Sequence, residues 1–295
     1  MPGDRSSEWP SQRPEEWSGE WRDELRALAR PASLREGDRL VVSGEELDGW
    51  AAERNLDRRR AEEAALEAGV VPVARLRNFE TLDCAGQLAL VRSTCAMAGL
   101  GGLGGVVLEL LVRAGVGRIR AADGDVFAEH NENRQLLATT ANRNRAKSGA
   151  ALERAAQLGS CTHLETIGSF LEEAGMNDLV RGADLAMDCL GGLAHRRALA
   201  SACARQGVRL VSAGVAGWTG WLAVVEPGGP SPAEMLGDGR SVEESLGTPG
   251  PIVWTLASLQ AAESVRLLSG GTSSLSGAML LVDLEAMRFE RVDLV

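Results

Sequence analysis

From residue 93 onward, short runs of apolar residues alternate with longer stretches in which apolar residues recur every three or four positions. The short runs are typical of buried strands, and the longer stretches are typical of amphipathic helices. Because strands that alternate with helices form a parallel sheet covered on both faces, the pattern predicts an α/β fold with a Rossmann-like, doubly wound, mostly parallel sheet. The predicted strands are 94–98, 118–122, 162–167, 184–189, 208–213 and 221–226, and the predicted helices are 103–113, 144–157, 170–181 and 193–206.

The two ends of the chain follow different patterns. Residues 1–25 mix three tryptophans with Pro, Ser, Glu and Arg, which predicts a disordered tail. Residues 26–74 show helical spacing and a capping box at Ser43 and Glu46, so they predict a small helical N-terminal region. The α/β domain then occupies 75–227, and residues 228–295 predict a crossover loop to 250, a helix at 251–269 and a C-terminal β-hairpin of the same domain.

Composition and charge exclude several classes of function. The chain has 295 residues, enough for one large domain, and its net charge of −10 disfavours nucleic acid as a partner because phosphate binding needs a basic face. The longest apolar runs, 208–215 and 221–225, are too short to cross a membrane, and the N-terminus has no apolar signal-peptide core. The five cysteines are scattered without a C-x-x-C pair, which predicts reduced thiols in the cytoplasm and no zinc site.

The first predicted strand runs directly into a glycine-rich segment, Gly99-Leu-Gly101-Gly102-Leu-Gly104, that leads into the first helix of the domain. This is the G-x-G-x-x-G pattern in the strand–turn–helix context that binds a nucleotide phosphate at a helix N-terminus. Asp123 ends the next strand, where a carboxylate can accept hydrogen bonds from ribose hydroxyls. The α/β domain is therefore predicted to bind a nucleotide.

Lys147 is the only lysine among the 31 basic residues of the chain. A genome composition that favours arginine explains most of this bias. A lysine that remains is expected where a compact point charge is required, and retention by chance is the alternative.

Beyond the second strand the chain carries Asp123-Gly-Asp125, then Asn131-x-Asn133-Arg134-Gln135, and then Lys147. Together with the glycine loop, these motifs resemble the ThiF/MoeB/HesA family of ubiquitin-activating-enzyme-like adenylyltransferases. The resemblance extends from Arg77 to Val292 and includes Asp188-Cys-Leu and the late segment Ser258-Leu-Gln260-Ala-Ala-Glu263. An ordinary dehydrogenase has no reason to place an Asn/Arg/Gln cluster and a lysine at these positions.

The resemblance implies that the protein uses ATP and Mg²⁺ to adenylate the C-terminal carboxylate of a small ubiquitin-fold sulfur-carrier protein ending in Gly-Gly, with release of pyrophosphate. Arg134 and Lys147 would then neutralise the triphosphate and the leaving pyrophosphate, the first as a planar fork and the second as a point charge. Asn131 and Gln135 would orient phosphate or metal-bound water. An upstream arginine, here Arg77, would reach the ATP site across the interface of a homodimer. The thiamine, molybdopterin and other thiocarboxylate-dependent pathways are all compatible with these residues.

The chain departs from the family pattern at the end of the fourth strand. The family has D-x-x-D there and its second Asp helps to hold Mg²⁺, whereas this chain reads Asp188-Cys189-Leu190-Gly191. Asp188 or Asp125 could replace the missing carboxylate, since Mg²⁺ prefers oxygen ligands. The cysteine that forms a thioester or persulfide in several relatives is also missing from 228–250, so covalent carrier transfer is not expected.

Two alternatives to an active adenylyltransferase follow from the residues. Gly191 favours a degenerate relative that binds nucleotide or carrier protein without adenylating it. An NAD-dependent oxidoreductase would share the glycine pattern, but the chain has no recognisable hydride-transfer site and the Asn/Arg/Gln cluster would be unexplained. Pyrophosphate exchange and nucleotide preference separate the three hypotheses.

Overall fold

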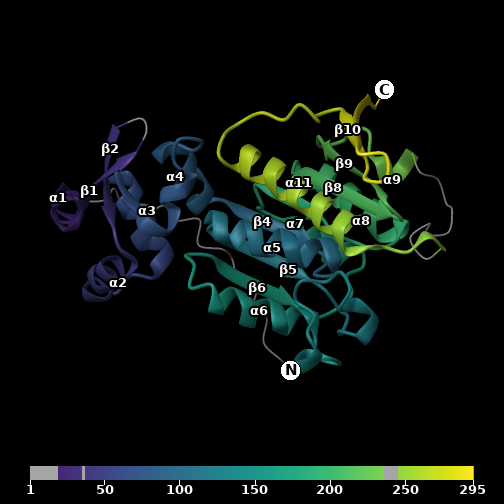
Figure 1. Cartoon of the computed structure of the whole chain (residues 1–295), viewed down its shortest axis with the longest axis horizontal. Helices are drawn as coiled ribbons and strands as arrows, with labels where there is room; N and C mark the ends of the chain where they lie inside the picture. Colours follow the sequence, from purple (N-terminus) through teal and green to yellow (C-terminus); the bar gives the residue numbers. More distant parts are fainter. Residues whose placement is uncertain (1–18, 35–36, 236–244, 295) are drawn as a thin grey trace.

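The computed structural model describes residues 19–34, 37–235 and 245–294 of the chain. An eight-stranded sheet forms its centre, with the strand order β11-β10-β9-β8-β7-β4-β5-β6 (Figure 1). Neighbouring strands are parallel from β8 to β6 and antiparallel from β11 to β8, which confirms the predicted Rossmann-like, mostly parallel sheet. The strands are β4 (Thr94–Ala98), β5 (Arg118–Ala122), β6 (His163–Ile167), β7 (Leu185–Asp188), β8 (Arg209–Ala216), β9 (Thr219–Val225), β10 (Ala278–Asp283) and β11 (Arg288–Asp293).

Helices cover both faces of this sheet. Residues of β4 alternate between the two layers: Cys95 and Met97 belong to the core beneath α5 and α11, whereas Ala96 and Ala98 pack with α7 and α8. All four side chains are at most 1% exposed, so β4 lies at the centre of the fold. The helices on the first face are α5 (Gly102–Ala114), α6 (Lys147–Gln157) and α11 (Gly250–Leu268), and those on the second are α7 (Glu173–Val180) and α8 (Leu193–Gln206).

A second, three-stranded sheet belongs to an N-terminal module of residues 19–72, at the far end of the molecule from the C-terminal hairpin (Figure 1). The predicted capping box is present, because Ser43 Oγ accepts from the Glu46 N–H at 3.2 Å and the Glu46 carboxylate accepts from the Ser43 N–H at 2.8 Å. The module consists of α1 (Gly19–Leu28), β1 (Arg30–Leu34), β2 (Gly37–Val42), α2 (Gly44–Glu53), α3 (Arg58–Glu67) and β3 (Val70–Pro72).

Two predictions for this region need correction. The tail predicted at 1–25 is wrong for its last residues, because α1 begins at Gly19; residues 1–18 lie outside the described part of the chain. The region predicted as helical at 26–74 also contains three strands. β1 carries Pro31, and β3 spans only three residues, so neither is long or regular enough to show the period-two pattern that identifies a strand.

Two buried carboxylates form ion pairs that join the module to the main domain. Glu62 and Glu63 of α3 are at most 3% exposed. The Nε atoms of Arg75 and Arg92 donate to them at 3.1 and 2.8 Å respectively, and Arg75 Nη1 also donates to the Arg113 carbonyl at 2.6 Å. Because a buried carboxylate without its cation is strongly destabilising, these contacts hold α3 against the main domain. Arg75 lies in η1 (Val73–Asn78) and Arg92 ends α4 (Cys84–Arg92).

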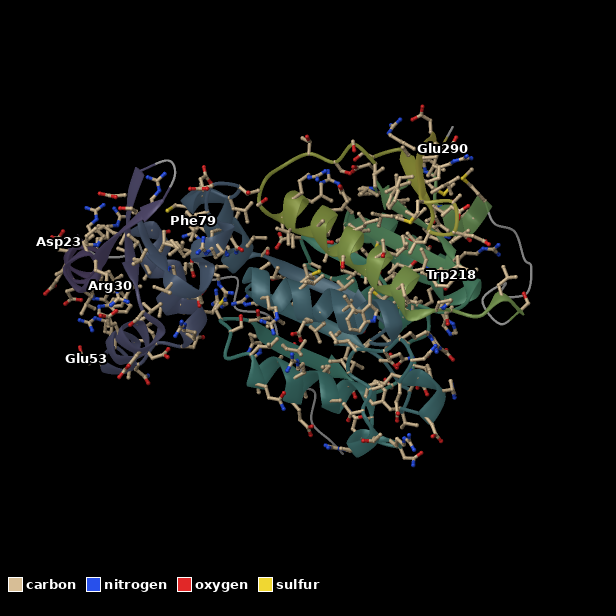
Figure 2. All side chains as sticks on the ribbon, in the orientation of Figure 1. Asp23, Arg30, Glu53, Phe79, Trp218 and Glu290 are labelled. Carbon is tan, nitrogen blue, oxygen red and sulfur yellow. The ribbon has the colours of Figure 1, made fainter. Side chains whose placement is uncertain are left out.

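Apolar packing reinforces the same junction. Phe79, labelled in Figure 2, is 6% exposed and belongs to a core cluster with Val41 and Leu66 of the module and Val91 of α4. The aromatic ring therefore bridges the two units where the chain passes from one to the other.

The C-terminal part agrees closely with the prediction. Part of the loop predicted at 228–250 forms α9 (Pro232–Met235), and residues 236–244 lie outside the described residues. The terminal hairpin is confirmed by antiparallel pairing of β10 with β11, from Ala278↔Asp293 to Asp283↔Arg288. No helix in the described ranges is long and apolar enough to span a membrane.

Candidate nucleotide-binding site

The glycine loop lies at the carboxyl end of β4, where close backbone packing dictates its sequence. Gly99 has a φ of +97°, and a Cβ added there would lie 2.5 Å from the Cys189 carbonyl oxygen. A Cβ on Gly104 would lie 2.0 Å from the carbonyl oxygen of Gly99. α5 then begins at Gly102, and its N-cap, Gly101, provides no side-chain cap. The N–H groups of the first helical turn are therefore left for a ligand, and the helix dipole favours an anion there.

Gly104→Ala is expected to lower the free energy of unfolding by about 1–3 kcal/mol, because the added methyl group overlaps the backbone of Gly99. Urea denaturation measures this change. Gly49→Ala is the matched control, since Gly49 lies in the exposed middle of α2 with no atom within 4 Å of an added Cβ, and alanine there should stabilise by about 0.5–1 kcal/mol. An unchanged unfolding midpoint for Gly104→Ala would contradict the close-packing argument.

A cavity of about 520 Å³ begins at the glycine loop and runs along the carboxyl ends of the central strands. It brings together residues that lie far apart in the sequence, from Ala98 to Val253. Of the predicted site residues, Gly104, Arg77 and Asp188 do not line it. The predicted residues that do line it are Gly99, Gly101, Gly102, Asp123, Asp125, Asn131, Arg134, Gln135 and Lys147.

Asp123 ties the glycine loop to the end of β5. Its Oδ2 accepts from the Leu100 N–H at 2.7 Å, and its Oδ1 accepts from the Asp125 N–H at 2.9 Å. A carboxylate offers about four lone-pair sites, so these two bonds leave acceptors open on the cavity side. The predicted ribose-binding role is compatible with this geometry.

Lys147 is the first residue of α6, and its charge is held by a carboxylate. Its Nζ lies 2.7 Å from Asp125 Oδ2, and its side chain is only 7% exposed, whereas that of Asp125 is 52% exposed. Burial by itself would raise the pKa of Asp125, but hydrogen bonds from Lys147 and from the Val126 N–H outweigh it and lower that pKa. Asp125 is thus an ionised carboxylate that fixes a nearly buried ammonium group at the cavity wall.

Asn131 and Arg134 lie at and just beyond the short turn η2 (Glu129–Asn131). Asn131 is buried, and its Oδ1 accepts from the Ala128 N–H at 2.9 Å, so its side chain caps this turn at the cavity wall. The Arg134 guanidinium donates to the His130 carbonyl at 3.0 Å and to Asn133 Oδ1 at 2.8 Å. These bonds orient the guanidinium at the cavity.

Gln135 has an unsatisfied polar atom in the cavity wall. The residue is 7% exposed, and its Oε1 has no hydrogen-bond partner among the described residues. An unpaired buried amide oxygen costs about 1–3 kcal/mol. We expect a donor on a bound ligand, or a water that the ligand orders, to form the missing hydrogen bond to Gln135 Oε1.

The structure corrects the prediction that Asp188 is a Mg²⁺ ligand. The residue is 1% exposed, and both carboxylate oxygens are engaged. Oδ2 accepts from Arg196 Nη1 at 2.8 Å and from Ser212 Oγ at 2.5 Å, and Oδ1 accepts from the Leu190 N–H at 3.1 Å. Asp188 is therefore part of a buried ion pair beneath the cavity.

The donor set around the cavity does not fit a Mg²⁺ site of the family type. Gly191 has no side chain where the family has its second carboxylate, Asp188 is paired with Arg196, and Asp125 is paired with Lys147. Nowhere in the described ranges do three or more His, Cys, Asp or Glu side chains converge as metal ligands. Magnesium bound with a nucleotide would rely on the triphosphate and water for most of its ligands.

The sequence did not reveal that Arg196 and Ser212 belong to the site. It also did not reveal that Gln260 supports this region. Gln260 Nε2 donates to the carbonyls of Asp188 at 2.8 Å and Val211 at 3.0 Å, so this motif residue links the end of β7 to β8. Arg196 is one of thirty arginines, and no local spacing links it to Asp188. Only the packing of α8 on the sheet identifies the pair.

Arg77 lies outside the nucleotide cavity. It lines a second cavity, which is formed with Arg39 of the module and with residues of α4 and α11 such as Gly86 and Arg266. Arg77 and the glycine loop therefore do not share a cavity within one chain.

Cys203, the last cysteine of the chain, packs in the core. It is 2% exposed, and burial raises the pKa of its thiol to about 12. A thiol with such a pKa does not supply the thiolate that covalent transfer requires.

The fold and the cavity define a nucleotide-binding α/β protein. The ThiF family model matches residues 73–294, and the chain belongs to the ThiF family. It is 34% identical over 194 residues to the sulfur carrier protein ThiS adenylyltransferase of Escherichia coli (strain K12), covering 63% of this chain and 76% of the relative. It is 28% identical over 225 residues to the molybdopterin-synthase adenylyltransferase of the same organism, covering 75% and 89%. These relatives place it in a family of adenylyltransferases.

The fold likeness extends further along the chain than the family match. A crystal structure of E. coli MccB with AMPCPP and MccA is 14% identical, has a TM-score of 0.66, and covers 92% of this chain and 96% of that chain. With 92% of the chain covered, most of the N-terminal module is included. The shared fold is thus the main domain together with its N-terminal addition.

Proposed function

We propose that this protein uses ATP to adenylate the C-terminal carboxylate of a small ubiquitin-fold sulfur-carrier protein ending in Gly-Gly, with release of pyrophosphate. The observation that supports it most is that Lys147 and Arg134 line one cavity with an uncapped helix N-terminus. Two cations and a helix N-terminus suit a triphosphate. The relatives named for ThiS and for molybdopterin synthase support the same substrate class.

The chemistry asks little of the protein beyond positioning and charge. A carboxylate oxygen of the carrier bonds to the α-phosphorus of ATP, and the bond from that phosphorus to the bridging oxygen of pyrophosphate breaks. Negative charge grows on the pyrophosphate, where Lys147, fixed by Asp125, and Arg134 would stabilise it. The attacking carboxylate is already ionised, so no general base is needed and His130 and His195 receive no role. ATP and Mg²⁺ are the proposed cofactors, with the metal carried by the triphosphate.

Pyrophosphate exchange tests the proposal. With ATP, labelled pyrophosphate and candidate carriers, label should enter ATP only when a carrier with an intact Gly-Gly terminus is present. A carrier that lacks its last glycine is the matched control. Calorimetry should also show tighter binding of ATP-Mg than of NAD. Tighter NAD binding would overturn the proposal in favour of an oxidoreductase.

A binding module without catalytic activity is the second candidate, and Gly191 together with the engagement of Asp188 by Arg196 favours it. The Gly191→Asp variant separates the two candidates. We expect slow exchange by the wild type and little gain from Gly191→Asp, because the cationic groups for the phosphates are present. If the wild type binds ATP but shows no exchange, and Gly191→Asp creates some, the binding module is the correct reading.

The proposed assembly is a homodimer in which Arg77 reaches the ATP site of the partner. Arg77→Ala and Lys147→Ala should each abolish exchange. Co-expressed together, they should recover about a quarter of wild-type activity, because half of randomly assembled dimers are mixed and each mixed dimer restores one of two sites. Co-expression of Arg77→Ala with the double variant is the control and should recover nothing. If the first mixture recovers no activity, Arg77 does not act at the ATP site of the partner.

The N-terminal module points to a second candidate acceptor. The family model begins at residue 73, whereas the likeness to the E. coli MccB structure, which contains MccA, includes most of the module. An acceptor of the MccA kind should therefore be tested in the same exchange assay. If MccA supports exchange and no Gly-Gly carrier does, a peptide of the MccA kind replaces the carrier as the proposed substrate. The proposed adenylation chemistry is then unchanged.

A further inference from the structure

Phe170 has a large apolar surface that the fold does not bury. At 73% exposure it is the most exposed aromatic side chain among the described residues, and it lines the nucleotide cavity. We propose that Phe170 stacks on the nucleobase of the bound nucleotide and favours a purine. This inference deepens the proposed function, because it names the residue that recognises the base in the same cavity.

The order of the strands supports this assignment. β4, β5 and β6 are adjacent, and the pairs Ala98↔Ala122 and Ala122↔Ile167 bring their carboxyl ends level with one another. The glycine loop follows β4, Asp123 follows β5, and Phe170 comes three residues after β6. A nucleotide laid across this edge with its phosphates at the glycine loop meets a carboxylate next and an aromatic ring last. That is the order of phosphate, ribose and base.

Local packing places one edge of the ring against the backbone beside Asp123. A Cβ added to Gly124 would lie 2.3 Å from the Phe170 nitrogen and 2.8 Å from its Cδ2, so the ring rests against the backbone one residue beyond Asp123. The Asp123 N–H donates to the Ile167 carbonyl at 3.0 Å, which anchors the start of the same loop. Leu171 and Met176, which follow Phe170 in the sequence and also line the cavity, are apolar. An apolar wall with one open ring suits the flat face of a base.

Calorimetry with Phe170→Ala and Phe170→Trp tests the assignment on the whole chain without any carrier. Phe170→Ala should weaken ATP binding by about tenfold or more, and should weaken UTP binding less, because a pyrimidine stacks less strongly than a purine. Phe170→Trp should keep the wild-type affinity. Phe289→Ala removes an equally large ring that is 50% exposed on β11, outside the cavity, and should change neither affinity.

Wild-type ATP affinity in Phe170→Ala would overturn the stacking assignment, and so would an equal loss for ATP and UTP. A change only in the KM for the carrier would also overturn it, since the ring would then contact the acceptor. These results are distinct from failure of the proposed function. Suppose that no carrier supports pyrophosphate exchange but Phe170→Ala still weakens ATP binding more than UTP binding. The stacking assignment then holds, and the proposed adenylation activity does not.

Discussion

Lys147→Arg is expected to reduce carrier-dependent pyrophosphate exchange by about 10²–10³-fold, or roughly 3–4 kcal/mol of transition-state stabilisation. The ammonium nitrogen is 2.7 Å from Asp125 Oδ2, and its side chain is 7% exposed, so the site is shaped for a compact charge. A guanidinium is larger and planar and would pair with both oxygens of Asp125, which moves the positive charge away from the phosphates. Exchange rates and calorimetric ATP affinities measure the effect.

The matched control is Arg145→Lys, two residues earlier. Arg145 pairs with Glu153, both side chains are more than half exposed, and exposed pairs of this kind contribute about 0–1 kcal/mol to stability. We therefore expect wild-type exchange from Arg145→Lys. A Lys147→Arg variant with normal ATP binding and exchange would show that the site does not require a compact charge. The single lysine would then have been retained by chance.

Asp188→Asn is expected to lower the free energy of unfolding by about 3–5 kcal/mol, because it removes the buried carboxylate that pairs with the buried guanidinium of Arg196. Both side chains are at most 3% exposed, so water does not compensate for the lost charge. Urea denaturation followed by circular dichroism measures the loss. A metal ligand would behave differently, since its removal would abolish exchange at unchanged stability.

Two further variants make this test specific. Asp178→Asn removes one partner of a surface pair with Arg181, in which both side chains are more than 60% exposed, and should leave stability nearly unchanged. The double variant Asp188→Asn with Arg196→Met removes both buried charges and should be more stable than Asp188→Asn alone. A stable but inactive Asp188→Asn protein would restore Asp188 as a candidate metal ligand.

The sequence by itself determined the main domain because its signals are local. Strand and helix periodicity identified the parallel sheet, and each predicted strand of that sheet overlaps an observed one. The spacing of Gly99, Gly101 and Gly104 identified the phosphate loop, and one of its close contacts is local, because a Cβ on Gly104 would overlap the carbonyl of Gly99. Motif spacing also identified Asp125 and Lys147 as candidate site residues, and in the structure the two form an ion pair.

Tertiary structure decided what depends on contacts between distant segments. The strands of the N-terminal module are short, and α1 buries Leu25 in a core with Leu47 and Trp50 that no local pattern reveals. Asp188 looked like a metal ligand in sequence, but α8 places Arg196 against it and converts the carboxylate into half of a buried ion pair. Phe170 carried no motif at all. Its importance appears only because β6 lies next to β5, so that a ring from one loop reaches the cavity built by another.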